Sequence, residues 1–412
     1  MRNPVHLLTG SLAVAALVCM APLTHYPTPS PTACDGGNAG LTLPSGFCAV
    51  LVGESLGPVR HIVVAPNGDI FAALQGRNGG ILALRDTNND GRADVKKHFG
   101  PGSGSGIALA GGYLYFAMDD RIVRYPWAAG QLTPAGEPEV IVQGLPTGGH
   151  GAKGIAVKGG MLYTSIGSRT NSCQQSDRAN HSPGIDPCTE LATRAGIWRF
   201  ASDRAGQSAA DGHRVATGLR NPMAVALDSA GTLFAGMHGR DQLGENWGFT
   251  EQDNAEQPAE ELVRVQDGDD FGWPYCYYDP AAKRLVLAPD YGGDGKEVGR
   301  CSAKKAPEAA FPGHWAPMAV AFYNGSQFPA SYLGGAFVAF HGSWNRAPLP
   351  QAGYRVVFVP FSGGRASGSS TDFVTPSGEP TSIRPSGLAV GPDGSLYLSA
   401  DTNGKIWRIS RQ

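Results

Sequence analysis

The sequence predicts an all-β fold, a six-bladed β-propeller, and three observations carry this prediction. One phrase recurs six times: a small residue, a short apolar strand, a turn that contains glycine, and a second apolar or aromatic strand. Segments with the 3.6-residue period of an amphipathic helix are nearly absent. Glycine accounts for 58 of the 412 residues and charged residues for only 17%, a composition that suits many short strands and tight turns.

The six copies of the phrase give the expected first and second strands of each blade. In chain order they occupy residues 61–71, 106–115, 154–163, 224–234, 319–340 and 387–397. The first strands begin 45 to 95 residues apart, and the wider intervals predict long insertions in blades three to five. A β-sandwich is the structural alternative, but it would not repeat one phrase six times.

A third strand is expected after each copy, at residues 80–85, 121–125, 196–200, 261–265, 354–360 and 405–409. One further apolar strand, at residues 47–52, precedes the first copy and has no place in the repeat. We expect it to complete the last blade and so to close the ring.

Residues 1–33 are predicted to be a signal peptide with a Pro-rich spacer, and residues 34–412 to be the propeller domain. Arg2 is the charged start of the signal, and residues 7–21 form an apolar core that is too short to span a membrane. No other stretch is long enough to cross a bilayer. We therefore expect a periplasmic or secreted protein without a membrane span.

The cysteines predict disulfides. Of seven cysteines, Cys19 lies in the predicted signal peptide, which leaves six. Six cysteines allow 15 pairings. Their number behind a signal peptide indicates an oxidising compartment, and neither a Cys-x-x-Cys pair nor a haem motif occurs. Sequence order favours three local pairs: Cys34–Cys48, Cys173–Cys188 and Cys276–Cys301.

Arginine and histidine residues fall at one phase of the repeat. In a propeller the innermost strand of each blade runs along the central channel, so the residue that enters it lies at one rim. The turns between second and third strands lie on the same face and add residues 75–77, 168–169, 239–241, 342–346 and 401–402. Four blades have an arginine or histidine at the entering position: His150, Arg220, His314 and Arg384.

These positions predict a cationic rim, rich in hydrogen-bond donors, around the channel. The alternative is that they are ordinary polar loops in solvent. That alternative does not explain why they share one phase in a chain whose net charge is −2. A bidentate arginine matches a carboxylate, so the rim suits a small polyanion. The same net charge gives no footprint for nucleic acid or for an anionic membrane.

Two positions of the rim suggest chemistry. Arg220 is a permanent cation with a planar donor fork, and Asn221 and Pro222 follow it in a turn. His150 stands in a Gly-Gly-His-Gly-Ala loop without apolar periodicity. A neutral imidazole there can take a proton from a substrate hydroxyl, and a structural histidine is the alternative. His314, in Pro-Gly-His-Trp, is a similar candidate.

Residues 86–94, Asp-Thr-Asn-Asn-Asp-Gly-Arg-Ala-Asp, match most of a calcium-binding loop. Position 12 of that pattern is Lys97 rather than Glu, so the loop is not a complete EF-hand. We expect bound calcium with a structural role, against the alternative of a plain Asn/Asp/Gly turn. The expected oxygen ligands stand at positions 1, 3, 5 and 9: Asp86, Asn88, Asp90 and Asp94.

Several of these segments together resemble the sorbosone dehydrogenase and soluble quinoprotein sugar dehydrogenase family. The resemblance extends from about residue 47 to the C-terminus, and it is carried by residues 218–222, 271–276, 340–346 and 384–390. It implies a six-bladed propeller that holds pyrroloquinoline quinone (PQQ) and calcium over the channel. It also implies oxidation of a sugar hydroxyl to a lactone or acid, with hydride transfer to PQQ.

The resemblance further implies residue roles. His150 matches the general base, and Arg220 with Asn221 matches the pair that contacts the reactive quinone. Gly239 and Arg240 match the turn whose backbone carbonyls bind the site calcium. Other contacts to the cofactor are implied for His314, Asn345, Arg346 and Arg384.

The substrate and the acceptor stay open at this point. Gly149 stands where the better-known soluble glucose dehydrogenases have an acidic residue, so an aldose, a pyranose or an osone such as sorbosone all remain. Because no haem motif is present, a separate electron acceptor is implied: a cytochrome, a quinone or a dye. Two other functions are alternatives, a calcium-dependent lactonase-type hydrolase and a non-catalytic ligand-binding propeller. The hydrolase would need carboxylates and metal-activated water at the rim.

Overall fold

The structure is a computed structural model that describes Met1 and residues 33–412. The predicted signal peptide and spacer therefore lie almost wholly outside the described residues. Thr32–Gln412 forms one compact unit. No helix among the described residues is long and apolar enough to cross a membrane.

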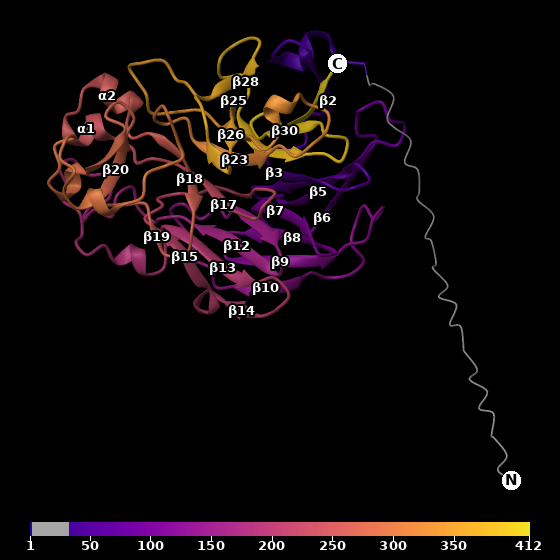
Figure 1. Cartoon of the computed structure of the whole chain (residues 1–412), viewed down its shortest axis with the longest axis horizontal. Coiled ribbons are helices and arrows are strands. Elements are labelled where there is room, and N and C mark those ends of the chain that lie inside the picture. The colour runs from indigo at the N-terminus through magenta and orange to yellow at the C-terminus, as the bar shows by residue number, and fades with distance from the viewer. Residues whose placement is uncertain (2–32) are drawn as a thin grey trace. The chain divides into compact units, whose positions relative to one another are not determined.

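Six sheets, each built on four antiparallel main strands, form this unit, and each sheet is one blade of a six-bladed propeller (Figure 1). The innermost strands are β3 (Val59–Val64), β7 (Gly104–Ala110), β11 (Ile155–Lys158), β16 (Ala224–Leu227), β23 (Pro317–Phe322) and β29 (Pro385–Val390). Each of them contacts the innermost strands of both neighbouring blades, and β29 contacts β3, so that the six close a ring.

The other strands of each blade follow outward in chain order. The second strands are β4 (Ile70–Leu74), β8 (Tyr113–Met118), β12 (Met161–Ile166), β17 (Leu233–Met237), β24 (Ala336–Phe340) and β30 (Leu396–Ala400). The third strands are β5 (Gly80–Arg85), β9 (Arg121–Pro126), β13 (Gly196–Ala201), β18 (Glu260–Val265), β25 (Arg355–Val359) and β31 (Lys405–Arg411). The fourth strands are β6 (Val95–Phe99), β10 (Glu139–Gln143), β15 (His213–Thr217), β22 (Ala309–Phe311), β28 (Thr371–Pro376) and β2 (Phe47–Gly53).

The short elements lie outside this repeat. Short strands extend three blades: β1 (Leu41–Thr42), β14 (Gln207–Ser208) and β19 (Asp269–Asp270). Two hairpins stand apart, β20 (Cys276–Asp279) with β21 (Arg284–Leu287) and β26 (Phe361–Ser362) with β27 (Arg365–Ala366). The helices are α1 (Leu243–Trp247), α2 (Glu251–Glu256) and the 3-10 turns η1 (Gly36–Gly40), η2 (Thr189–Ala192), η3 (Ala209–Asp211), η4 (Pro289–Tyr291), η5 (Gly299–Ala303) and η6 (Ala330–Tyr332).

The strand before the first repeat closes the ring, as predicted. Strand β2 pairs antiparallel with β31, with Leu51 opposite Trp407, so residues from both ends of the unit share the last blade. The sixth blade is therefore held together by pairing between residues from opposite ends of the described unit.

Blade faces form the core. Each blade packs its two faces against its neighbours, so the second strands β4, β17, β24 and β30 are buried at every residue. Between the fifth and sixth blades, Phe337, Phe373 and Trp407 belong to one buried cluster. Burial of these apolar strands, rather than local propensity, is what orders the repeat.

The long insertions predicted for blades three to five are present, and they follow second or third strands. One runs from β12 to β13 (167–195), and another runs from β17 to β18 (238–259) and carries α1 and α2. All three predicted disulfides form: Cys34–Cys48, Cys173–Cys188 and Cys276–Cys301. Cys173–Cys188 lies within the 167–195 insertion, and Cys276–Cys301 lies in the segment between β18 and β22.

Candidate functional site

A pocket of about 220 Å³ lies where blades three to five present the entries of their innermost strands. Its walls are mostly charged or polar side chains, in contrast to a larger pocket of about 520 Å³ at the opposite ends of β3, β7 and β29. The larger pocket is lined by aliphatic residues, glycines, Pro66 and Trp127, and none of its lining residues titrates. Acid–base chemistry therefore belongs to the smaller pocket, which contains three of the four predicted strand-entry residues: His150, Arg220 and His314.

Arg220 is the most heavily bonded side chain of the pocket and is only 3% exposed. Its Nε donates to the Asn171 carbonyl at 3.0 Å, and its Nη2 donates to Asn171 Oδ1 at 3.0 Å and to Asp241 Oδ2 at 2.8 Å. Its Nη1 donates to the Gly239 carbonyl at 2.7 Å. These bonds fix the plane of the guanidinium.

Asp241 is the counter-ion of this cluster. It accepts from Arg220 and from Arg178 Nη2, both at 2.8 Å, and its other oxygen accepts from Asn345 Nδ2 at 2.8 Å. Burial alone would raise its pKa, but the Arg220 and Arg178 charges outweigh burial and hold the pKa of Asp241 well below its usual range. The carboxylate therefore stays ionised, and the cluster keeps one net positive charge.

His150 reaches the pocket from a tight glycine loop. Gly149 has φ +57°, and a Cβ there would lie 2.3 Å from the Arg169 carbonyl, so only glycine fits. The imidazole Nδ1 lies 3.0 Å from both the carbonyl oxygen and Oγ of Ser168, whose hydroxyl donates to the Thr170 carbonyl at 2.7 Å. A carbonyl can only accept, so Nδ1 carries the proton and Nε2 keeps its lone pair.

The other ring nitrogen of His150 faces no described hydrogen-bond partner, and the side chain is half-buried. Burial, with the nearby charge of Arg220, lowers the pKa of His150 to about 3. The imidazole is therefore neutral at pH 7, and its free lone pair is available to accept a proton without prior deprotonation.

Two further histidines are fixed as neutral donors. His238 Nε2 lies 2.9 Å from the Pro317 carbonyl, and burial lowers the pKa of His238 to about 3. Its Nδ1 is 3.5 Å from Asn221 Nδ2, which is how Asn221 joins the cluster. His314 Nε2 lies 2.7 Å from the Asn254 carbonyl, and its Nδ1 lies 3.2 Å from Asn345 Nδ2.

Glu260 closes the floor of the pocket and was not anticipated. It is 2% exposed, accepts from the Gly239 backbone N–H at 3.3 Å, and burial raises its pKa to about 8. Near neutral pH it is therefore largely protonated. Arg178 and Asn171 were also unassigned by the sequence. Trp344 belongs to a predicted rim turn, lines the pocket and is 65% exposed.

Arg384 lies one blade away from the pocket wall. Its Nε donates to the His341 carbonyl at 3.1 Å, and its Nη2 donates to the Gly342 carbonyl at 3.1 Å. Next to it, Arg60 Nη1 and His341 Nε2 both contact Asp401, at 2.6 and 2.9 Å. This second cluster extends the cationic rim toward blades one and six.

Two predicted cofactor or metal positions point their side chains elsewhere. Arg346 is 6% exposed and pairs with Glu256 at 2.6 Å, so its side chain holds α2 against the turn. Arg240 pairs with Asp290 within the insertions, and it is not among the residues that line the pocket. The Gly239 carbonyl already accepts from Arg220, which leaves one lone pair for a cation.

The predicted calcium loop lies between β5 and β6, away from the pocket. Its acidic oxygens face the loop's own backbone: Asp86 accepts from Gly91 N–H at 2.8 Å, and Asp94 accepts from Thr87 N–H at 2.8 Å. Among residues 33–412, no three His, Cys, Asp or Glu side chains gather as a metal site. Calcium in this loop, with Asn88 and Asp90 as further ligands, stays a prediction.

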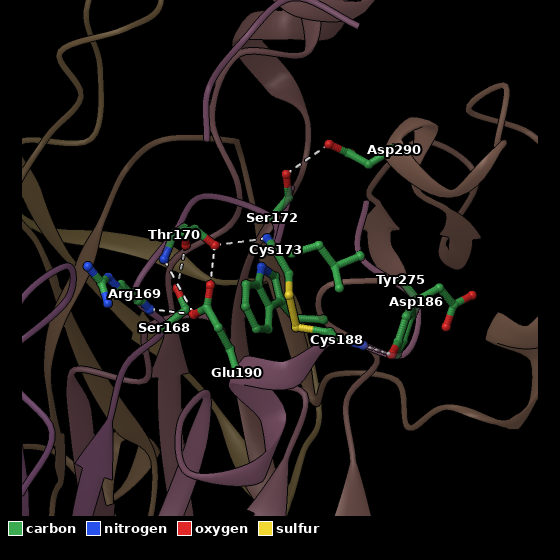
Figure 2. The surroundings of a disulfide bond; sticks show 12 residues. Ser168, Arg169, Thr170, Ser172, Cys173, Asp186, Cys188, Glu190, Tyr275 and Asp290 are labelled. Atoms are coloured by element: carbon green, nitrogen blue, oxygen red, sulfur yellow. Dashed lines mark hydrogen bonds between the residues drawn. A yellow bond between two sulfur atoms is a disulfide. The ribbon is translucent and has the colours of Figure 1, made fainter. Parts of the chain in front are cut away.

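The 167–195 insertion forms one wall of the site and is held by a disulfide. Figure 2 shows the Cys173–Cys188 bond, with the Glu190 carboxylate directed at the backbone of residues 169 and 170. Glu190 Oε2 accepts from Arg169 N–H at 2.6 Å, and Tyr275 Oη accepts from Cys188 N–H at 2.8 Å. The insertion supplies Ser168, the partner of His150, and Asn171, the partner of Arg220.

The donor set fits an anionic ligand together with a cation. Arg178 and Arg220 share a single ionised carboxylate, so the pocket has cationic charge left for carboxylates of a ligand. Asn345 Oδ1 is buried without a partner among the described residues, and the free lone pair of the Gly239 carbonyl lies in the same pocket. Neutral oxygen ligands of this kind suit calcium.

Comparison with known proteins gives a family match over most of the chain. The model of a family described as TrAA12-like matches residues 41–412. A curated relative, the PQQ-dependent pyranose dehydrogenase of Coprinopsis cinerea, is 29% identical over 233 residues, which cover 47% of this chain and 31% of that protein. The match thus spans about a third of the relative's length.

Two solved structures share the fold. The holo form of the pyranose dehydrogenase PQQ domain from Coprinopsis cinerea has a TM-score of 0.74 and 22% identity, and it covers 90% of this chain and 97% of its own. The calcium structure of the Trichoderma reesei Carbohydrate-Active Enzymes Family AA12 protein has a TM-score of 0.75 and 18% identity, with coverage of 90% and 97%. At these identities the likeness shows the fold alone.

Proposed function

The chain belongs to the TrAA12-like family, and from that premise we propose that it is a PQQ- and calcium-dependent dehydrogenase that oxidises a sugar to a lactone or acid. The observation that carries the proposal is the orientation of His150. Its Nδ1 is tied to Ser168, so its Nε2 lone pair is free beside a cationic cluster. The proposed substrate is an aldose, a pyranose or an osone such as sorbosone, in keeping with the pyranose dehydrogenase relative.

The residues that would hold PQQ are Arg220 and Asn221, with His314 and Asn345 from the fifth blade and Arg384 from the sixth blade. Calcium would bind the carbonyls of Gly239 and Arg240. When bound, PQQ supplies a quinone that accepts a hydride from the sugar carbon. Arg346 supports the turn that carries Asn345, because its guanidinium is held by α2 and by the Gly313 carbonyl at 3.1 Å.

His150 acts as the general base. The sugar hydroxyl that is to be oxidised donates its proton to Nε2, while Nδ1 keeps its bond to Ser168 and fixes the ring plane. The resulting imidazolium is stabilised by the Ser168 carbonyl and, at longer range, by Asp241, whose charge favours the protonated ring. The hydroxyl loses its proton, and the carbon that bears this hydroxyl loses a hydride. Together the two losses leave a carbonyl group on the sugar.

Trp344 offers a surface for the sugar ring. Its indole is 65% exposed and lines the pocket, and it is one of few large apolar side chains exposed among the described residues. The apolar face of a pyranose can lie against such a ring, while its hydroxyls meet the polar walls. The position fits a substrate that approaches from solvent.

The proposal includes a separate electron acceptor and an oxidising compartment. The sequence has no haem-attachment motif, so electrons would leave to a cytochrome, a quinone or a dye. The three disulfides support a periplasmic or secreted location.

Reconstitution tests the proposal. Apoprotein stripped with chelator should reduce a dye in the presence of sugar only after PQQ and calcium are both added. Aldoses, pyranoses and osones are screened in parallel, and NAD or flavin with the same sugars serves as the control. Dye reduction with NAD or flavin but not with PQQ, or calcium-dependent lactone hydrolysis without PQQ, would overturn the assignment.

A further inference from the structure

Lys153 is a buried cation that the mechanism above does not use. Its side chain is fully buried, with 0% exposure, three residues after His150. Its Nζ donates to the Pro146 carbonyl at 3.0 Å and, at very short range, to the Gly151 carbonyl. Lysine is almost never fully buried without partners, and here the two carbonyls are its hydrogen-bond partners. The burial of a cation at this place suggests a specific role for Lys153.

The two carbonyls lie on either side of His150, the proposed base, in the sequence. Pro146 lies four residues before His150, and Gly151 follows it directly. Between them, Gly148 and Gly149 have φ values of +74° and +57°, so the loop is a tight turn with little intrinsic rigidity. One ammonium group thus joins both ends of the loop.

Charges on the neighbouring elements offset the burial of this ammonium only in part. Burial, together with the charge of Arg194, lowers the pKa of Lys153 to about 8, while Asp119 and Asp120, on the turn between β8 and β9, favour the charged form. A Cβ on Gly151 would lie 3.2 Å from Asp119 Oδ2, which shows how closely this carboxylate approaches the loop.

A second cation binds the middle of the same loop. Arg194 Nη2 donates to the Thr147 carbonyl at 2.5 Å, and its Nη1 donates to the Gly148 carbonyl at 3.3 Å. Four of the carbonyls between residues 146 and 151 are therefore held by two side chains. Of these two side chains, Lys153 is the fully buried one, and it donates hydrogen bonds to the carbonyls at the two ends of the loop.

We propose that Lys153 is a positioning residue for His150, because its ammonium fixes the glycine loop so that Nδ1 meets Ser168 and Nε2 faces the pocket. The expected effect of Lys153 on turnover rests on the proposed function. Its effect on the orientation of His150 concerns the protein without cofactor and does not rest on that function. Lys153 touches neither substrate nor cofactor in this scheme, and it acts only through His150.

The first measurement reads the imidazole directly in apoprotein. Ring nitrogen chemical shifts of His150, assigned by comparison with His150→Ala, should report a single Nδ1-protonated tautomer in the wild type. Lys153→Met, which keeps the length of the side chain but removes the donors, should give a mixture of tautomers. Lys153→Arg, which keeps a cationic donor, should restore most of the wild-type signal and guards against a Met variant that does not fold.

The second measurement is a double-mutant cycle at saturating PQQ and calcium. A small displacement of a catalytic group can reduce turnover on the order of 10- to 100-fold, and we expect that loss for Lys153→Met. In the His150→Ala background the same change should alter turnover by about twofold or less, because the path through His150 is already gone. The control is Lys158→Met, since exposed Lys158 also donates to two carbonyls, of Asp228 and Ser229, at 3.4 and 2.8 Å.

Equal losses in both backgrounds, or an unchanged tautomer in Lys153→Met, would overturn the positioning role. If the tautomer changes as expected but no variant, including the wild type, turns over sugar with PQQ, the proposed function fails while the geometric role of Lys153 stands.

Discussion

At the scale of single residues, the pocket is a balance of buried charges. Among residues 33–412, Asp241 is the ionised carboxylate that pairs with both Arg220 and Arg178, and Glu260 beside them is largely protonated near neutral pH. Such a cluster has cationic character without an isolated buried cation. An anionic ligand can then enter without first breaking an ion pair.

Replacing Asp241 should expose this balance. Asp241→Asn leaves Arg220 and Arg178 without their counter-ion, and loss of one partner of a buried pair typically costs about 3–5 kcal/mol of stability. Added PQQ should recover part of the loss, because its carboxylates supply the missing negative charge. Thermal melts with and without PQQ measure both effects.

The matched control is Asp372→Asn, which breaks the exposed Arg355–Asp372 pair and should cost at most about 1 kcal/mol. Equal melting temperatures for Asp241→Asn and the wild type would contradict the role of Asp241 as counter-ion.

His61 should make the fold sensitive to acid. Burial lowers its pKa to about 4, against 6.5 for an ordinary histidine, and its Nε2 lies 2.8 Å from the Met318 carbonyl. The unfolded chain therefore binds the proton first, so the stabilisation is complete above pH 6.5 and is lost as the pH falls toward 4. The ring is only half-buried, so we expect about 1 kcal/mol between pH 6.5 and pH 5.

Melts of wild type and His61→Gln in chelator, at pH 7 and pH 5, measure this term. The wild type should lose more stability than the variant on acidification. Parallel losses in the two proteins would show that His61 does not carry the effect.

The residues of the site could be predicted from the sequence only in part. His150, Arg220 and His314 share a phase of the repeat, and a repeat fixes where a phase falls in space, so these three do meet in one pocket. Asp241 stood inside a predicted rim turn and could have been assigned as the counter-ion of an arginine. No sequence pattern marked Glu260 as a pocket residue, because its position in the pocket depends on a turn that packs against it in the folded protein.

At the scale of elements, strands and insertions differ in how well they could be predicted. The six third strands follow the predicted ranges within a residue or two, because alternating apolar strands between glycine turns are a local pattern. The insertions have no such pattern, and they bring Asn171 and Arg178 to the site through their own hydrogen bonds and disulfides. Those contacts join distant parts of the sequence, such as Ser172 with Asp290 at 2.9 Å (Figure 2).

Removing the disulfides one at a time separates their contribution to stability from their contribution to PQQ binding. Cys173–Cys188 and Cys34–Cys48 close segments of similar length, with sequence separations of 15 and 14, so each should contribute about 3 kcal/mol. Paired Cys→Ser variants should therefore lose similar stability. Only the Cys173/Cys188 variant should also weaken PQQ binding, because this disulfide lies within the 167–195 insertion, which carries Ser168 and Asn171.

A PQQ titration and a thermal melt on each paired variant measure the two effects. A Cys173/Cys188 variant that binds PQQ as tightly as the wild type, or an equal loss of affinity in the Cys34/Cys48 variant, would contradict this division.

At the scale of the whole molecule, the closed ring relates the repeat to the site. Because β2 completes the last blade, the six strand entries face one rim, and blades three to five contribute their insertions above it. The propeller, the ring closure and the family resemblance could all be predicted from the repeated phrase and a few motifs, and all three are confirmed. The orientation of the Arg346 side chain could not be predicted from the sequence, because its partner Glu256 lies in an insertion.

The central claim is that the His150 Nε2 lone pair removes the substrate proton in a PQQ site. The most direct measurement is sugar turnover of wild type and His150→Ala at saturating PQQ and calcium, with a PQQ titration on both. His150 carries no permanent charge, so PQQ affinity should stay within about a few fold, while turnover should fall by about 10²–10⁴-fold. Near-normal turnover of His150→Ala at saturating cofactor would contradict the claim.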